Sequence, residues 1–171
     1  MTLRAARPLD PWRWLGIPAL LCLAASIVFA VPLRVFGMQL PEPVFAMVPA
    51  FAWAVIRPSV LAPFALLILG VLLDALWGSP LGLWASCLLI AYASVLLSRN
   101  LMSGQSPPIM WAWYAGVTAL AMLVGYLITM IDAKGRPGLA PLFWQFAWTV
   151  ILYPFAHRLI GRFEDADVRF K

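Results

Sequence analysis

The chain has 171 residues, of which 64% are hydrophobic and 11% charged, and its mean hydropathy is +0.91. Ordinary soluble domains are about half apolar and about a quarter charged, and a chain this short cannot bury such an apolar excess in its own core. The composition therefore excludes an ordinary soluble domain and predicts one polytopic membrane domain over residues 1–171.

The net charge of +5 does not indicate a nucleic-acid-binding protein. The basic residues are scattered at the ends of apolar runs, as cations are along the surfaces of a membrane protein. Five of the tryptophans lie near predicted span ends, which is typical of an aromatic belt: Trp12, Trp14, Trp77, Trp111 and Trp144. Cys22 and Cys87 lie within apolar runs, where we expect them to pack as small hydrophobic residues.

The first two candidate spans differ in length. A spanning helix needs about 20 apolar residues, and the run from Trp14 to Leu33, after an arginine-rich tail over 1–13, is long enough. We expect this run to be retained rather than cleaved as a signal peptide, because further spans follow it. The segment 44–56 is short and contains Pro49, so either it spans together with residues 40–43 or it is re-entrant.

That second segment has alanines at every fourth position: Ala46, Ala50 and Ala54. In a helix they form a smooth stripe that another helix can approach closely, so we interpret them as a packing or partner face.

The third and fourth spans are joined by a tight turn. The third runs from about Ser59 to Trp77, and Gly78 suits a left-handed residue after it. Ser79 is predicted to cap the fourth helix, Pro80 to occupy its first turn, and the helix to continue to about Ser98. The last two spans cover 109–131 and 139–160, and the charged segment 161–171 forms a water-exposed tail.

The cations predict the orientation of these six spans. With both termini on one side, that side holds nine of the twelve basic residues and the other side holds three, Arg34, Lys134 and Arg136. Cytoplasmic connections carry the excess of Lys and Arg, so both termini are predicted to lie in the cytoplasm.

Asp74 is the only acidic residue well inside an apolar run, and Gly70 and Gly78 share its helix face. A charge in the hydrocarbon region is costly, so it must face protein or water. In one interpretation the carboxylate accepts hydrogen bonds from free N–H groups around Leu81 to Leu83 and fastens the turn. In the other it binds a cation, a proton or a partner's charge.

The sixth span carries a polar ridge with Gln145, Thr149, Tyr153 and His157 at four-residue intervals. Such groups seek partners on neighbouring helices, so we interpret them as contacts between helices, with a docking face for another membrane protein as the alternative. The sequence contains no phosphate-binding glycine loop, HExxH or GxSxG motif, and we predict no catalytic residue, metal or cofactor.

The stretch 57–99 resembles the signature of the rod shape-determining protein MreD family. Its matching residues are Gly70, Asp74, Gly78, Pro80 and Gly82, with Ser79 inside the same turn. The resemblance covers about a quarter of the chain, and the remainder matches in size and hydropathy. It implies that these residues shape the turn between the third and fourth spans.

The resemblance also implies a non-enzymatic scaffold subunit of the bacterial complex that elongates rod-shaped cells. Its implied partners are a bitopic MreC-like protein and, through it, the MreB filament, the glycosyltransferase RodA and its transpeptidase. It implies a location in the inner membrane and a six-helix fold like that of the substrate-binding subunits of energy-coupling-factor transporters.

Two other functions remain open. A subunit that binds a vitamin-like molecule for a transporter needs an enclosed cavity with convergent polar groups, which Asp74, Gln145 and Tyr153 supply if they meet. An intramembrane enzyme requires Asp74 and His157 to lie within hydrogen-bond reach, whereas the predicted topology puts them near opposite membrane faces.

Overall fold

The computed structural model describes residues 12–29, 34–35, 38–39, 42–56, 59–132 and 138–168. These residues are helical except for connections and one small hairpin. The elements in chain order are a π-helical turn η1 (Trp12–Gly16), α1 (Ile17–Phe29), β1 (Arg34–Val35), β2 (Met38–Gln39), α2 (Met47–Ile56), α3 (Leu61–Trp77), α4 (Leu83–Met102), α5 (Pro107–Asp132), α6 (Leu139–Ile151) and α7 (Tyr153–Val168). The two strands pair antiparallel, with Arg34 opposite Gln39.

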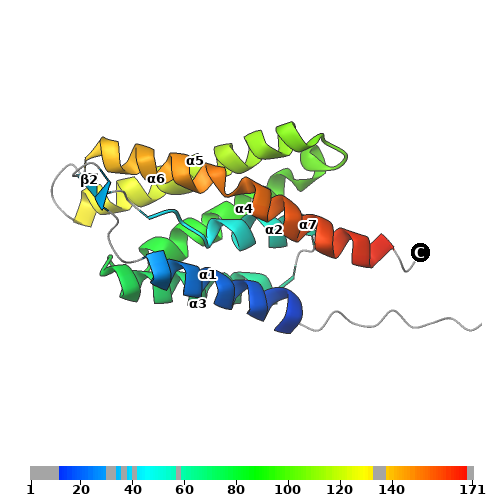
Figure 1. The fold of residues 1–171 in the computed structure, drawn as a ribbon, viewed down its shortest axis with the longest axis horizontal. Helices are drawn as coiled ribbons and strands as arrows, with labels where there is room; N and C mark the ends of the chain where they lie inside the picture. The colour runs from blue at the N-terminus through cyan, green and yellow to red at the C-terminus, as the bar shows by residue number, and fades with distance from the viewer. Residues whose placement is uncertain are drawn as a thin grey trace, which may run out of the picture.

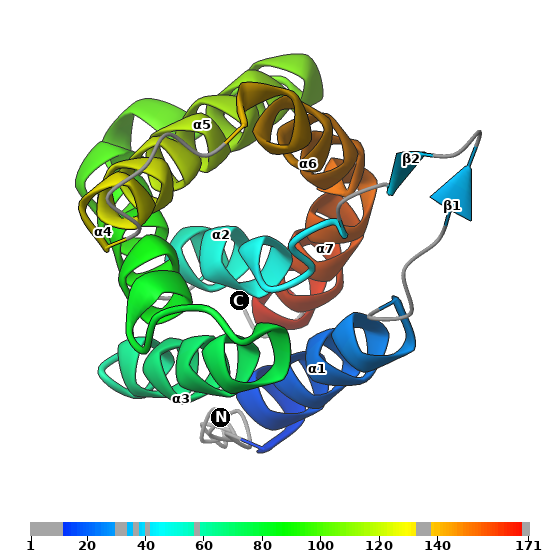
Figure 2. The ribbon, with the colours of Figure 1, turned by 90° about the vertical axis from the view of Figure 1, so that its left-hand side faces the viewer.

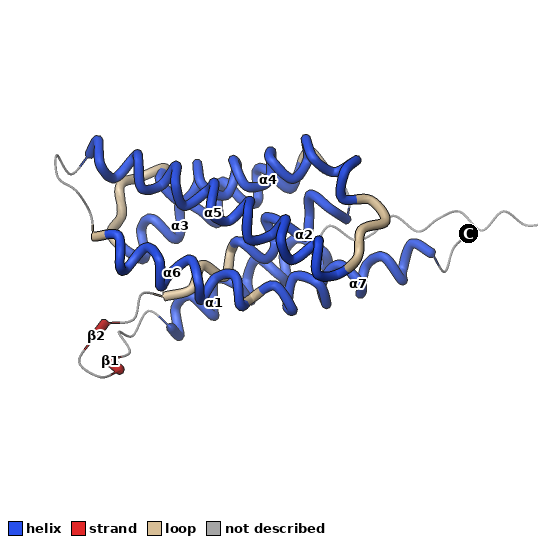
Figure 3. Tube along the Cα trace, turned by 90° about the horizontal axis from the view of Figure 1, so that it is seen from above, coloured by secondary structure: helices blue, strands red, loops and turns tan. Residues whose placement is uncertain are grey.

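The helices run side by side along the long axis of the molecule (Figure 1), with α2 in the middle of the others (Figure 2). Most connections lie at the two ends of the bundle (Figure 3). The start of η1 and the end of α7 lie at the same end of the molecule (Figure 1).

In the part of the chain that the structure describes, three helices are long and apolar enough to cross a membrane: Leu83–Met102, Pro107–Ile131 and Leu139–Gly161. The apolar helices Trp14–Phe29, Met47–Ile56 and Leu61–Trp77 are shorter. The predicted all-helical architecture is thus confirmed apart from the hairpin, and three candidate spans are compatible with a membrane protein. The prediction of six full spans is not confirmed.

The second predicted span is a short helix that follows an extended segment. α2 has 10 residues, which at about 1.5 Å per residue cover only half of a hydrocarbon core about 30 Å thick. Residues 42–44 before it are not helical. Pro49 lies in the first turn of α2, where its missing N–H breaks no helical hydrogen bond.

The last helix extends past the end of the last predicted span. α7 continues to Val168, whereas the predicted span ends at residue 160. Residues 162–168 contain no proline or glycine that would end the helix.

The alanine stripe of α2 is buried inside the chain itself. Ala46, Ala50 and Ala54 have no exposed surface, and neither does Trp53 on the same helix. The indole N–H of Trp53 donates to the carbonyl of Trp14 over 3.0 Å, which ties α2 to the start of η1 and α1. The stripe therefore packs against helices of this chain and is not a free partner face.

Gly70 lets α3 approach α4 closely. A Cβ atom added to Gly70 would overlap the Cα atom of Ala85 and the carbonyl carbon of Trp84. These are backbone atoms, which cannot turn aside as a side-chain end can. Gly70 is therefore required by the contact between the helices, as the sequence predicts for a residue on this face.

Substituting Gly70 tests this contact against a matched glycine. Gly70→Ala must push α3 and α4 apart, and overpacking of this kind costs about 1–3 kcal/mol of stability. Gly116, in the interior of α5, has nothing within 4 Å of an added Cβ, so Gly116→Ala should be neutral or stabilising by up to about 1 kcal/mol. Thermal unfolding of both variants in mild detergent measures the difference. Equal melting temperatures of the two variants would show that the α3–α4 contact leaves room for a side chain at position 70.

Candidate functional site

The carboxylate of Asp74 fastens the turn between α3 and α4. It accepts hydrogen bonds from the Ser79 hydroxyl at 2.7 Å, the Gly82 amide at 2.8 Å and the Trp84 amide at 2.9 Å. We call these four residues the Asp74 latch. The Asp74 side chain is 1% exposed, so a charge buried in the protein is met by three donors. Two of the donors are backbone amides at the start of α4, where the helix dipole favours an anion.

The latch differs in detail from the predicted turn. Gly78 takes the predicted left-handed conformation, with φ of 65°, and Gly82 has φ of 94°. Ser79 does not cap α4 and Pro80 does not lie in its first turn, because α4 begins only at Leu83. The N-cap residue is Gly82, which has no side chain to cap with. The carboxylate of Asp74, from the preceding helix, occupies the position of a cap.

The polar ridge of α6 pairs with the extended segment before α2. The Gln145 side-chain amide donates to the Glu42 carbonyl at 3.1 Å. The Val44 amide donates to the Thr149 hydroxyl at 3.0 Å, and that hydroxyl donates to the Gln145 carbonyl at 2.7 Å. Non-helical backbone that is buried in protein requires such hydrogen-bond partners. In this structure the ridge residues form contacts between segments, as the sequence interpretation describes.

A second set of contacts surrounds the break between α6 and α7. Pro154 has no N–H, so it cannot pair the Val150 carbonyl one turn earlier. That carbonyl instead accepts the indole N–H of Trp111 at 3.2 Å. The Thr149 carbonyl accepts the hydroxyl of Tyr114, also at 3.2 Å. The Thr149 carbonyl also accepts the Leu152 amide at 3.0 Å, so the side chains of α5 add donors to the carbonyls at the break.

The last two ridge residues lie beyond this break. The Tyr153 hydroxyl donates to the Pro107 carbonyl at 3.2 Å. The exposed His157 ring stacks on Tyr153, with ring centroids 6.0 Å apart. The turn that holds Asp74 and the end of α7 lie at opposite ends of the bundle (Figure 1), so Asp74 and His157 do not meet.

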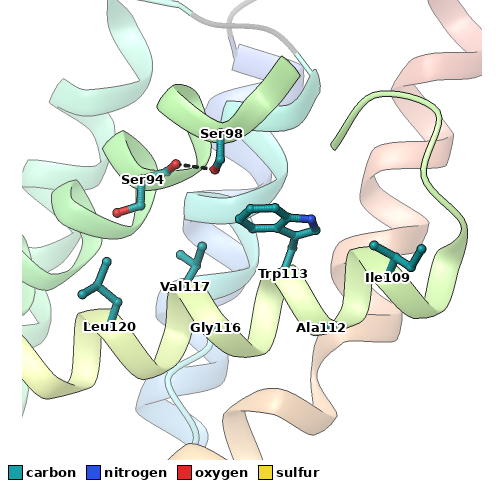
Figure 4. A pocket seen from close by; sticks show the side chains of 8 residues that line it. All are labelled: Ser94, Ser98, Ile109, Ala112, Trp113, Gly116, Val117 and Leu120. Atoms are coloured by element: carbon teal, nitrogen blue, oxygen red, sulfur yellow. Dashed lines mark hydrogen bonds between the residues drawn. The ribbon is translucent and has the colours of Figure 1, made fainter. Parts of the chain in front are cut away.

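An open pocket of about 520 Å³ lies between α4 and α5. Figure 4 shows Ser94 and Ser98 above it and Trp113 and Val117 below. The two serine hydroxyls donate to carbonyls of their own helix, at 2.7 Å and 2.6 Å. Its lining therefore offers an apolar surface rather than a set of free polar groups.

A smaller pocket of about 190 Å³ lies between α4, α5 and α6. Its lining includes Tyr126, Thr129 and Gln145, but neither Asp74 nor Tyr153. The three polar residues that the carrier hypothesis needs do not converge there. Cys87, which also lines it, is free and buried, and Cys22 is free and half-buried. Among the described residues, no three His, Cys, Asp or Glu side chains gather as a metal site would need.

Sequence reasoning missed the acceptors and donors that lie far away in the chain. Glu42 is one of them: its carboxylate accepts the indole N–H of Trp77 at 2.8 Å. Burial raises the pKa of Glu42 above its ordinary value, and the hydrogen bond from Trp77 opposes this shift only in part. No sequence pattern pairs residue 42 with residue 77, because neither periodicity nor a known motif links them.

In comparisons with known proteins, no family model, curated protein or solved structure matches the chain.

Substituting Asp74 measures the strength of the latch. Asp74→Asn keeps the shape but loses the charge, and it replaces one of the two acceptor oxygens with an NH2 donor that faces another donor. We expect a loss of about 3 kcal/mol, since hydrogen bonds to charged groups contribute about 1.5–3 kcal/mol each. Ser79→Ala removes one donor and should cost less than half of this. Thermal unfolding in mild detergent compares the variants. An Asn variant that melts like the parent but loses function would instead favour a proton-relay role.

The pKa of Glu42 predicts a pH dependence of stability. A folded-state pKa above the ordinary value of 4.5 means that the folded protein binds more protons than the unfolded chain in that interval. Stability should therefore fall as pH rises from about 4.5 through the folded-state pKa of Glu42. Glu42→Gln still accepts from Trp77 but has no charge, so it should lack this fall. Melting temperatures of both proteins between pH 4 and pH 7 test the sign, and parallel curves would contradict it.

Proposed function

We propose that this protein is a non-enzymatic scaffold of the bacterial cell-elongation complex in the inner membrane. The observation that carries the proposal is the Asp74 latch. The residues that resemble the MreD signature lie at the contact between α3 and α4 and at the turn that joins them, where the carboxylate of Asp74 accepts three hydrogen bonds from its own chain. A motif that is committed to shaping a hairpin suits a structural subunit rather than a catalytic one.

The polar ridge supports the same proposal. Gln145 and Thr149 pair with residues 42–44, and Tyr153 pairs with the first residue of α5. These side chains maintain the bundle, so the outward surface is dominated by apolar side chains. In a membrane, such a surface contacts lipid and the spans of other proteins.

The proposed topology has both termini in the cytoplasm. The described chain starts and ends at one end of the bundle (Figure 1), which agrees with the nine-to-three distribution of basic residues. In this proposal the partner is a bitopic MreC-like protein, through which the chain connects to MreB, RodA and its transpeptidase and supports lateral peptidoglycan synthesis.

The second candidate is a vitamin-binding transporter subunit, and the pocket lined by Gln145 is the observation in its favour. Its volume of about 190 Å³ falls below the roughly 300–1,000 Å³ typical of ligand pockets, which favours the scaffold.

Depleting the protein in its native host tests the proposal. A scaffold of the elongation complex predicts that rod-shaped cells become round as the protein is lost, and that a bitopic MreC-like protein co-purifies with the tagged full chain. Ser103→Ala, at an exposed loop position, serves as a control that should restore the rod shape. Normal rods without such a partner would reject the proposal. Thermal stabilisation by a vitamin would favour the carrier.

A further inference from the structure

The pocket of about 520 Å³ between α4 and α5 is hollow because small residues line it. We call it the α4–α5 groove. α4 contributes Ser94 and Ser98, one turn apart, and α5 contributes Ala112 and Gly116, also one turn apart. A Cβ atom added to Gly116 meets nothing within 4 Å, so the groove has free space beside this residue.

The groove begins near one end of the bundle and reaches about half-way along α5. Its lining on α5 runs from Ile109, two residues after the helix starts, to Leu120. Eleven residues of helix correspond to about 17 Å. One leaflet of a hydrocarbon core about 30 Å thick measures about 15 Å. The groove therefore has about the length of one leaflet, and its mouth lies where α4 ends and α5 begins.

A cation lies near the mouth of the groove. Arg99 is in the last turn of α4, directly after Ser98, and it is the only charged residue between Asp74 and Asp132. Its side chain is half-buried, and arginine can keep its apolar stem in the membrane while the guanidinium reaches the surface. A guanidinium without a neighbouring carboxylate along these two helices suits the phosphate of a lipid head group.

A hydrogen-bond donor lies deeper in the groove. The ring of Trp113 lines it, and Figure 4 shows the ring nitrogen on the side of Ile109, toward the mouth. Trp111 and Tyr114 on the same helix donate to carbonyls of α6, whereas no such bond pairs the Trp113 N–H within the described residues. An unpaired N–H in hydrocarbon is costly, so this group favours an occupant that brings an acceptor.

These features follow the order of the parts of a glycerophospholipid. Arg99 lies three residues before the end of α4 and Trp113 six residues after the start of α5, which places them about 5 Å and 9 Å from the span ends along a helix. A lipid carries its phosphate outermost, its ester carbonyls next and its acyl chains innermost. The innermost part of the groove suits a chain, because the hydroxyls of Ser94 and Ser98 already donate to their own helix.

Two other occupants fit these features less well. A helix of another protein is about 10–12 Å across and spans the full core of about 30 Å, whereas the groove ends at mid-depth. A second copy of this chain, inserted in the same orientation, would bring its own Arg99 to the level of the first, and like charges repel.

We infer that the α4–α5 groove binds one acyl chain of a phospholipid from the leaflet at the α4–α5 connection. The Trp113 indole N–H donates to an ester carbonyl of this lipid, and Arg99 pairs with its phosphate. In the proposed topology this is the cytoplasmic leaflet. The inference requires only that α4 and α5 span a bilayer, so it does not rest on the cell-elongation proposal.

Photolabelling with a lipid tests the inference. The full chain, freed of lipid in mild detergent, is titrated with phosphatidylglycerol that carries a diazirine in the middle of one acyl chain, and the adducts are mapped by mass spectrometry of peptides. We expect saturable labelling of residues that line the groove. Ile68, an outward side chain of α3 that is 60% exposed, should give only weak labelling that does not saturate.

Filling the groove gives a matched pair of variants. Gly116→Leu places a side chain in the free space, so the saturable labelling should disappear. Ala93→Leu adds a leucine at an exposed position of α4 outside the lining, and it should leave the labelling unchanged. Both positions are exposed, so the melting temperatures of the two variants should match that of the parent.

Two further variants test the contacts with the head group. Trp113→Phe keeps a ring but removes the N–H, so the half-saturating lipid concentration should rise about 2- to 12-fold, as expected for one lost hydrogen bond. Unlabelled diacylglycerol with the same chains lacks the phosphate and should compete more weakly than unlabelled phosphatidylglycerol. In Arg99→Gln the two competitors should become equal.

The inference would be overturned by equal labelling of the groove and Ile68, by saturable labelling that persists in Gly116→Leu, or by an unchanged half-saturating concentration in Trp113→Phe. Equal competition by the two lipids in the parent would contradict the phosphate contact. In the native host, p-benzoylphenylalanine at position 120 should crosslink to lipid, and an adduct with another polypeptide would show that a protein occupies the groove instead. Cells that become round on depletion, with no saturable labelling, would refute the lipid site and leave the scaffold proposal standing.

Discussion

The structure depends on one constraint: a backbone N–H or carbonyl group that a helix does not pair must find another partner before it can lie in lipid. Three of the interruptions of the helical backbone in the described residues illustrate this constraint. The start of α4, the extended residues 42–44 and the break between α6 and α7 each leave groups that no helical turn satisfies. At each place a side chain from a different segment supplies the hydrogen bond, and those side chains include Asp74, Gln145 and Trp111.

This constraint explains why so apolar a chain retains polar residues in its helices. Thr149 is fully buried, and its hydroxyl both accepts from the Val44 amide and donates to the Gln145 carbonyl. The hydrogen-bonding groups of the Thr149 hydroxyl are thus paired within the bundle. The same constraint explains Trp111 on α5, whose indole N–H donates to the Val150 carbonyl beside the α6–α7 break.

Local sequence patterns predicted the elements whose causes are local. The left-handed Gly78, the close approach at Gly70 and the positions of the long apolar helices follow from glycine geometry and hydropathy. The sequence predicted that Asp74 contacts amides near the start of α4. It assigned the N-cap of α4 to Ser79, because the cap residue usually belongs to the segment that directly precedes the helix. The pairing of Gln145 with residue 42 joins segments 103 residues apart, and no periodicity encodes it. The sequence indicated that segment 44–56 is short, but it could not decide whether residues 42–44 extend the helix, since hydropathy does not distinguish a buried non-helical segment from a helix.

The position of Asp74 has a consequence for biosynthesis. Its carboxylate belongs to α3, but two of its hydrogen-bond donors belong to the residues that begin α4. In the proposed six-span topology, α3 entering the bilayer alone would bring an uncompensated negative charge with it, and α4 alone would present unpaired amides. When the two helices lie together, the amides at the start of α4 pair with the carboxylate of α3. The two segments should therefore leave the translocation channel as a single helical hairpin, already folded at its tip before the later helices of the chain are made.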